Sequence, residues 1–261
     1  MKSRDDFALI LGGSKGLGLG TAKKLCREGF PVIVLHRDRR KDLEEIQQSF
    51  EDIRNSGGIL HTFQIDALSR DARKEFIRDL PGILGEARIA TVVYSIAKGN
   101  LRSLKGPEKE SGLGITDFRL TADAMAFALY EWMEDLMASR LLAGDCRLIA
   151  FTSEGSQRVL PNYGAVSCAK ASLEALIRQM AVEWARYGIR ANCLQAGVTD
   201  TESLRMIPGS DEILTESLRR NPIGRLTLPE DVANAVYLLS LPEAAWINGN
   251  IIRVDGGEGL C

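Results

Sequence analysis

Residues 7–18 read FALILGGSKGLG, an apolar run that leads directly into a glycine-rich turn. Gly12, Gly16 and Gly18 give the turn the spacing G-x3-G-x-G, and a helical pattern follows until Gly29. Glycine adopts backbone angles closed to other residues and lets a pyrophosphate approach the free N–H groups of a helix start. A strand, this turn and a helix in that order predict the first βαβ unit of a nucleotide-binding fold.

Six more apolar runs rich in β-branched residues follow, with longer segments of helical periodicity between them. Because these runs have no polar face, helices should cover both faces of the sheet. Strand alternating with helix predicts parallel pairing and right-handed crossovers. We therefore predict the α/β class, with residues 1–261 as a single Rossmann-type doubly wound domain that has a parallel sheet of about seven strands. The predicted strands are 7–11, 31–35, 59–65, 89–95, 147–153, 189–195 and 251–255, and the longest predicted helices are 117–142 and 170–187.

The composition narrows the class of protein. The chain has 261 residues, of which 45% are hydrophobic, and a formal net charge of -2. Affinity for nucleic acid needs a concentrated excess of Lys and Arg, so no nucleic-acid partner is expected. No run approaches the roughly 18 apolar residues of a membrane helix, so we expect a soluble, cytoplasmic protein without membrane contact. The five cysteines form no C-x-x-C pair, so neither a disulfide framework nor a metal site is predicted.

The residues after the second strand indicate which cofactor is bound. An NAD site usually has Asp or Glu there, whereas an NADP site has Arg or Lys against the 2'-phosphate. Arg37 follows that strand and Lys15 lies in the glycine turn, so two cations can converge on one phosphate. This favours NADPH, although Asp38 could serve the 2'-hydroxyl of NADH. Further cofactor contacts are expected from Gly12, Ser14, Gly16, Leu17, Asp66, Ala67, Ser95, Ile96, Ala97, Lys170, Gly197, Val198 and Thr201.

The pattern Ser153-x9-Tyr163-x6-Lys170 supplies candidate catalytic groups. At about 100° per residue, seven residues return a helical side chain to within about 20° of the same face, so Tyr163 and Lys170 could point the same way. An ammonium near a phenol favours the phenolate and improves proton donation. A Tyr and a Lys at this spacing are usually unrelated when they occur alone, so this interpretation depends on the family that the chain resembles.

These motifs resemble the short-chain dehydrogenase/reductase family over essentially the whole chain. The evidence comprises the glycine turn, Asp66, Tyr163, Lys170, the segment 189–201 and the terminal IIRVDGG. Most of that family has Tyr and Lys four residues apart, whereas Val166 stands at that position here. The longer gap resembles the enoyl-acyl-carrier-protein reductases of bacterial fatty-acid synthesis, as do YSIA (94–97), PNYGAVSCAKASLEA (161–175) and AGVTDT (196–201). The ordinary three-residue gap in the glycine turn resembles a smaller NADPH-using branch of those reductases.

The resemblance implies NADPH-dependent reduction of the 2,3 double bond of an enoyl thioester. Tyr163 would stabilise the enolate oxygen, Lys170 would hold the nicotinamide ribose and tune Tyr163, and segment 198–221 would cover the acyl chain. An acidic acyl-carrier protein would need a basic patch, for which Arg219, Arg220 and Arg225 are candidates. A homotetramer is also implied by this resemblance alone.

Two departures keep other functions open. Ser153 stands where the larger family has its catalytic serine, and it could bond the substrate oxygen or only its own turn. The asparagine that often completes the family's proton relay is missing near residues 120–125. The alternative enzyme is a short-chain reductase or dehydrogenase of a carbonyl or alcohol. A protein of another class, a non-catalytic NADPH-binding sensor, is disfavoured by intact Tyr163 and Lys170.

Overall fold

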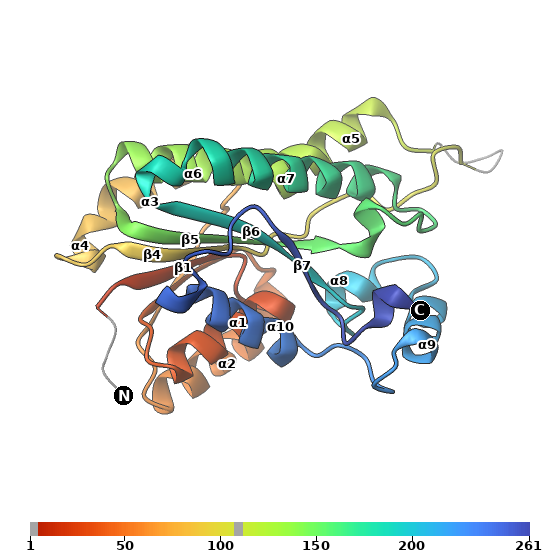
Figure 1. The fold of residues 1–261 in the computed structure, drawn as a ribbon, viewed down its shortest axis with the longest axis horizontal. Coiled ribbons are helices and arrows are strands. Elements are labelled where there is room, and N and C mark those ends of the chain that lie inside the picture. Colours follow the sequence, from red (N-terminus) through yellow and green to blue (C-terminus); the bar gives the residue numbers. More distant parts are fainter. Residues whose placement is uncertain (1–4, 107–111) are drawn as a thin grey trace.

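The computed structural model describes residues 5–106 and 112–261, which fold around one seven-stranded sheet (Figure 1). Every neighbouring pair of strands is parallel, and the strand order is β3-β2-β1-β4-β5-β6-β7. The predicted parallel, doubly wound α/β class is therefore confirmed. The strands are β1 (Phe7–Leu11), β2 (Val32–His36), β3 (Leu60–Gln64), β4 (Ile89–Tyr94), β5 (Leu142–Ser153), β6 (Ile189–Ala196) and β7 (Ile251–Val254).

All seven predicted strands are present, but β5 begins at Leu142 and not at Arg147. The extra residues include Gly144 and Asp145, which break the apolar pattern, although Leu142 pairs with Ile89 of β4. The helix predicted over 117–142 is accordingly too long at its carboxyl end.

Helices cover both faces of the sheet, as predicted. Figure 1 shows α3, α6 and α7 on one side of the sheet and α1, α2 and α10 on the other. The helices are α1 (Gly16–Arg27), α2 (Leu43–Asn55), α3 (Arg70–Asp79), α4 (Pro81–Leu84), α5 (Ile115–Ala122), α6 (Ala128–Ala138), α7 (Gly164–Glu183), α8 (Glu202–Arg205), α9 (Ser210–Arg220) and α10 (Pro229–Ser240).

Alternate residues of the central strands supply the two layers of the core. Leu9 and Leu11 of β1 pack in the cluster that contains Trp132 of α6, while Ala8 and Ile10 pack in the cluster on the α1, α2 and α10 side. Strand side chains point alternately to opposite faces, so a strand buried on both sides must be apolar throughout. This is why the strand signal in the sequence was strong.

A π-helical segment, Asp123–Phe127, joins α5 to α6. Such segments are rare and occur often at functional sites. The Tyr94 hydroxyl, at the end of β4, donates a hydrogen bond of 2.5 Å to the carbonyl oxygen of Ala124. Met125 of the same segment lines a cavity at the carboxyl edge of the sheet. The π segment therefore links the end of β4 to that cavity.

Parallel strands place all their carboxyl ends along one edge, where open α/β sheets bind ligands. The segments that follow β1, β4, β5 and β6 meet there, and α8 and α9 belong to the segment after β6. This edge brings together the sequence motifs described above.

We expect Gly18→Ala to lower the free energy of unfolding by about 2 kcal/mol, the range of overpacking in a filled site. A Cβ at Gly18 would lie 2.1 Å from the carbonyl oxygen of Gly12, whereas one at Gly82 would meet no atom within 4 Å. Urea denaturation of both alanine variants measures the effect. Equal stability of Gly18→Ala and Gly82→Ala would contradict the tight packing of this turn.

Candidate active site

The glycine turn forms a cradle that fits a pyrophosphate. Gly12 has a φ of +91°, and a Cβ there would lie 3.0 Å from the backbone carbonyl of Ser95. The helix α1 starts at Gly16, so its first N–H groups lack intrahelical partners and face the turn. Side chains in place of these glycines would fill the space that a phosphate needs. The residues present therefore suit a dinucleotide.

A cavity of about 490 Å³ extends from this turn along the ends of β2, β3 and β4. The structure brings most of the predicted cofactor contacts to its wall. These residues are Gly12, Ser14, Lys15, Gly16, Leu17, Arg37, Asp66, Ala67, Ser95, Ile96, Ala97, Lys170 and Thr201.

Two of the cations that line this cavity, Lys15 and Arg37, form ion pairs with carboxylates. Lys15 forms ion pairs with Asp42 at 3.1 Å and with Glu202 at 2.7 Å. Arg37 forms an ion pair with Asp66 at 3.0 Å, and its side chain is 61% exposed. Because Glu202 starts α8, the Lys15 pair ties the glycine turn to the segment after β6.

Asp38 is held differently from the other charged groups. Its carboxylate lies 2.7 Å from Nδ1 of His36, and both side chains are at least 90% buried. His36 ends β2 and packs against the ring of Phe50 at 5.2 Å between ring centroids. The carboxylate that could have served a 2'-hydroxyl is therefore bonded to a neighbouring side chain.

A second cavity, of about 700 Å³, adjoins the first. Its wall includes the predicted residues Ser153, Tyr163, Gly197 and Val198, while Leu17, Ala97, Lys170 and Thr201 line both cavities. Every predicted site residue thus borders one of two connected spaces. The apolar part of the second wall comprises Leu101, Met125, Leu160, Val166, Leu204, Ile207 and Ile213.

Tyr163 lies immediately before the first residue of α7 and not within the helix. The expectation that Tyr163 and Lys170 lie on one face of the same helix therefore does not hold for the backbone of Tyr163. Burial raises the pKa of Tyr163, and a side-chain hydrogen bond with Ser153 opposes that rise. Ser153 Oγ also accepts a hydrogen bond of 3.1 Å from the backbone N–H of Gly155. Ser153 thus contacts both its own turn and Tyr163.

Lys170 is buried in α7, and its Nζ donates a hydrogen bond of 2.8 Å to the carbonyl oxygen of Phe151. Burial lowers the pKa of Lys170 to about 8, because desolvation disfavours the charged form. We expected Lys170 to lower the pKa of Tyr163. In the structure the group that lowers this pKa, against the effect of burial, is Ser153.

Glu174 was missed by the sequence analysis. It lies one turn beyond Lys170 in α7, is 4% exposed, and accepts a hydrogen bond of 2.6 Å from Thr152 Oγ1. Its negative charge raises the pKa of Lys170 against the effect of burial. Three consecutive residues at the end of β5 are therefore bound by Lys170, Glu174 and Tyr163 in turn. The sequence feature that could have indicated Glu174 is its position four residues after Lys170, because residues at this spacing are neighbours on a helix.

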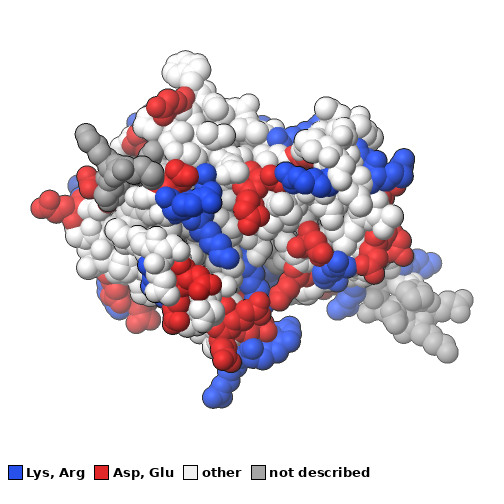
Figure 2. Space-filling view, turned by 90° about the horizontal axis from the view of Figure 1, so that it is seen from below, with Lys and Arg blue, Asp and Glu red and all other residues white. Residues whose placement is uncertain are grey.

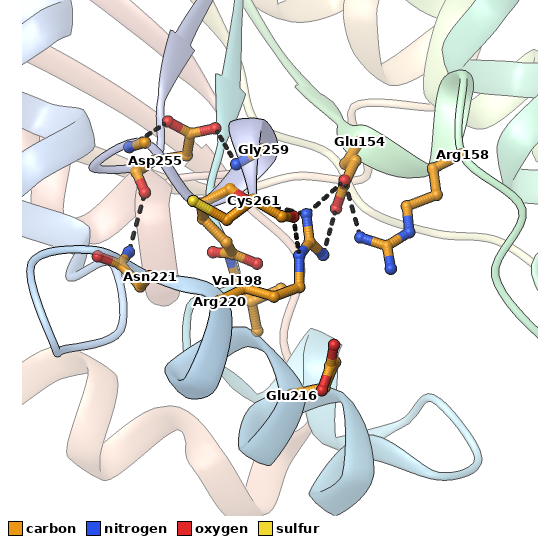
Figure 3. Close-up of polar contacts among 12 residues, drawn as sticks. Glu154, Arg158, Val198, Glu216, Arg220, Asn221, Asp255, Gly259 and Cys261 are labelled. Atoms are coloured by element: carbon orange, nitrogen blue, oxygen red, sulfur yellow. Dashed lines mark hydrogen bonds and ion pairs between the residues drawn. The ribbon is translucent and has the colours of Figure 1, made fainter.

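Arg220 builds the outer wall of the second cavity (Figure 3). It is 9% exposed and donates hydrogen bonds to both carboxylate oxygens of Glu154 and to the carbonyl oxygens of Glu258 and Cys261. The single side chain joins α9, the segment after β5 and the segment after β7. Nearby, Glu258 Oε2 accepts a hydrogen bond of 3.1 Å from the Val198 N–H.

Of the three arginines expected to form a basic patch, the side chains of Arg219 and Arg225 are 73% and 50% exposed, whereas that of Arg220 is 8% exposed. Arg220 is buried on Glu154, Arg219 pairs with Glu216 at 2.8 Å, and Arg225 pairs with Asp231 at 2.6 Å. Figure 2 likewise shows Lys and Arg interspersed with Asp and Glu over the face that it presents. Glu216 lies three residues before Arg219 on α9 and Asp231 lies six residues after Arg225, whereas Glu154 is 66 residues from Arg220 and could not be foreseen from the linear sequence.

Across 5–106 and 112–261, no group of three or more His, Cys, Asp or Glu side chains could hold a metal ion. Within the same ranges, no helix has the length and apolar character to cross a membrane.

A family model described as enoyl-(acyl carrier protein) reductase matches residues 12–258. The chain belongs to the short-chain dehydrogenase/reductase family. It is an oxidoreductase, and short-chain dehydrogenase/reductases of this kind use a nicotinamide cofactor and act on small-molecule or acyl substrates.

The relatives of this short-chain dehydrogenase/reductase differ in substrate. It is 30% identical to a 3-oxoacyl-acyl-carrier-protein reductase of Aggregatibacter actinomycetemcomitans, over 97% of this chain and 98% of the relative. It is 27% identical to a probable 2,4-dienoyl-CoA reductase of Bacillus subtilis, over 97% of this chain and 96% of the relative. Its fold matches the crystal structure of an NADH-dependent enoyl-acyl-carrier-protein reductase of Aquifex aeolicus with a TM-score of 0.83, at 23% identity and over 98% and 97% of the two chains.

We expect Glu174→Gln to narrow the alkaline side of the pH–rate profile. The ammonium form of Lys170 persists below its pKa of about 8 and is lost as the pH rises through that value. A neutral glutamine no longer raises that pKa. The decrease of kcat/KM for the cofactor on the alkaline side should therefore begin at a lower pH in the variant than in the wild type. Glu183→Gln, at the exposed end of α7, should leave the profile unchanged. Coincident alkaline limbs for the wild type and Glu174→Gln would contradict this role.

Proposed function

We propose that this chain catalyses the NADPH-dependent reduction of the 2,3 double bond of an enoyl thioester carried by an acyl-carrier protein, in fatty-acid synthesis. The observation that carries the proposal is the position of Tyr163, seven residues before Lys170, outside α7 and on the wall of a largely apolar cavity of about 700 Å³. Segment 198–221, which contains α8 and α9, would cover the acyl chain.

The position of the phenol suits an enoyl substrate for a physical reason. In enoyl-thioester reduction the hydride goes to C3, while charge develops on the thioester oxygen three bonds away. A group that stabilises that charge must therefore be displaced from the hydride site. A tyrosine four residues before Lys170 would replace Val166 inside α7, whereas Tyr163 precedes the helix. This displacement supports the enoyl thioester over a ketone.

The residues of the site would divide the work as follows. A bound nicotinamide cofactor supplies the hydride. Tyr163, whose pKa is raised by burial, is protonated at neutral pH and would donate a hydrogen bond to the enolate oxygen. Lys170 lines both cavities, so its ammonium would hold the ribose next to the nicotinamide. Met125, Val166 and Ile207 would exclude water from the reacting double bond.

The choice of NADPH is supported by three cations at the far end of the cofactor cavity. Lys15, Arg37 and Arg39 all line that cavity. The carboxylate of Asp38, which would otherwise compete for a ribose hydroxyl, is bonded to His36. Lys15 and Arg37 have carboxylate partners, whereas Arg39 has no ion pair among the described residues. A 2'-phosphate would add its negative charge to this group of cations.

We expect Arg37→Ala to reduce the preference for NADPH over NADH about tenfold, the effect of removing one charge-assisted contact of about 1.4 kcal/mol. KM values for both cofactors measure the preference. Arg40→Ala is the matched control, because Arg40 is exposed nearby and does not line the cavity. An unchanged KM ratio in Arg37→Ala would contradict the proposed phosphate contact.

A homotetramer is part of the proposal. Phe127, Tyr130 and Val182, on and beside α6 and α7, are 46%, 38% and 76% exposed, and an apolar surface of this kind supports pairing of subunits.

A second candidate function is reduction of a 3-oxoacyl thioester or another carbonyl. The hydrogen bond between Ser153 and Tyr163 favours it, because a hydroxyl pair can bind the oxygen of a ketone that receives hydride at the same carbon. The relative from Aggregatibacter actinomycetemcomitans is named for that reaction.

Comparison of crotonyl thioesters, acetoacetyl thioesters and simple ketones separates the two candidates. We expect NADPH consumption to be fastest with the crotonyl thioester, and Tyr163→Phe to lower kcat by about 10² to 10⁴ while cofactor binding is retained. Tyr130→Phe is the control, since Tyr130 lies on the surface of α6 and bonds Glu134. Equal rates with crotonyl and acetoacetyl thioesters would favour the second candidate, and full activity of Tyr163→Phe would rule out the role given to Tyr163.

A further inference from the structure

The cations that line the 700 Å³ cavity differ in what binds them. Arg158 and Arg220 both form ion pairs with Glu154, and Lys170 donates to the carbonyl oxygen of Phe151. Lys98, four residues after the end of β4, is exposed and lines both cavities. In the part of the chain that the structure describes, Lys98 has no ion pair or hydrogen bond. Its charge is therefore available to a ligand.

Lys98 begins a basic segment, residues 98–106, which contains Arg102 and Lys105 but no acidic residue. Arg102 and Lys105 are also exposed, and neither has a side-chain ion pair within the described ranges. Exposed charges in one short segment add their potentials and attract a polyvalent anion more than a single cation does.

The basic segment is fixed beside the candidate catalytic tyrosine. The Asn100 N–H donates a hydrogen bond of 3.2 Å to Thr121 Oγ1, and Asn100 Nδ2 donates one of 2.5 Å to Asp117. Leu104 packs against Gly164, the residue after Tyr163, so closely that a Cβ there would lie 3.0 Å from Leu104 Cδ2. Lys98 therefore lines the substrate cavity in a segment that these contacts hold in place, and Arg102 and Lys105 follow it in the same segment.

The remaining charge on the cavity wall has the opposite sign. Glu212 and Glu216 of α9 line the cavity, and α9 lies well apart from α5 and its preceding segment in Figure 1. Glu216 pairs with Arg219, whereas Glu212 has no ion pair among the described residues. Glu212 would repel an anionic group that leaves the cavity, and the basic segment would attract it. The distribution of charge thus gives the exit a preferred side.

We propose that Lys98, together with Arg102 and Lys105, binds the phosphate of a phosphopantetheine arm that carries the acyl thioester. This inference rests on the proposed function, in which the acyl chain fills the apolar cavity and the thioester reaches Tyr163. The arm then leaves past residues 98–106, and the negatively charged phosphate at its end meets the unpaired cations. Acyl-carrier protein and coenzyme A both carry this phosphate on the arm, as a phosphodiester in the first and within a pyrophosphate in the second.

Crotonyl phosphopantetheine and crotonyl pantetheine, which differ only in the phosphate, test the inference. We expect the wild type to show a KM about fivefold lower for the phosphorylated substrate, because a few exposed ion pairs of modest strength act together. The difference should disappear in Lys98→Ala/Arg102→Ala and remain in Lys98→Arg/Arg102→Lys. It should also remain in Lys23→Ala/Arg27→Ala, which removes two exposed charges from α1.

Equal KM values in the wild type, or a ratio that survives in Lys98→Ala/Arg102→Ala, would overturn the inference while leaving the proposed function intact. If neither thioester is reduced, the proposed function fails. Calorimetric binding of butyryl phosphopantetheine against butyryl pantetheine then still decides whether these cations bind the phosphate. The source of the arm is identified by the loss of kcat/KM in Lys98→Ala/Arg102→Ala. A larger loss with crotonyl acyl-carrier protein than with crotonyl coenzyme A would identify the carrier protein, and the reverse would identify coenzyme A.

Discussion

The hydrogen bond from the buried Lys170 ammonium to the carbonyl oxygen of Phe151 fixes α7 against the carboxyl end of β5. A buried cation without such a partner would be strongly destabilising, so the contact constrains where the helix can lie. Glu174 extends the same contact by binding Thr152, one residue further along the strand. Tyr163, at the start of the helix, is thereby held next to Ser153. The position of the phenol thus depends on the contacts between α7 and the end of β5.

The contacts between α7 and β5 are important because the two cavities meet there. Lys170 lines both the space along the glycine turn and the apolar space beside Tyr163. The turn itself is closed so tightly that a Cβ at Gly18 would lie 2.1 Å from the Gly12 carbonyl oxygen, which fixes the floor of the first space. Arg220 closes the second space by joining α9 to Glu154. One side of the site therefore suits a dinucleotide, and the other suits an acyl chain.

The fold could be predicted from local pattern, because buried parallel strands are apolar throughout and the glycine turn has a fixed order of strand, turn and helix. The residues predicted for the site line the two cavities, and their roles stay predictions. Contacts between distant residues could not be predicted from local pattern. Lys15 pairs with Glu202, 187 residues away, and Arg220 pairs with Glu154, 66 residues away. The second of these ion pairs buries Arg220, one of the three arginines expected to form a basic patch. The start of α7 after Tyr163 also escaped prediction, since helix ends depend on packing as much as on sequence.

If the displaced Tyr163 directs this site toward an enoyl thioester, as we propose, hydride must reach C3 of that substrate. The transferred hydrogen can be followed when crotonyl thioester is incubated with NADPH deuterated at its transferable position. We expect a butyryl thioester with one deuterium at C3, detected by NMR spectroscopy and mass spectrometry. Absence of labelled butyryl product, with acetoacetyl thioester converted to a 3-hydroxybutyryl thioester labelled at C3, would contradict the proposal.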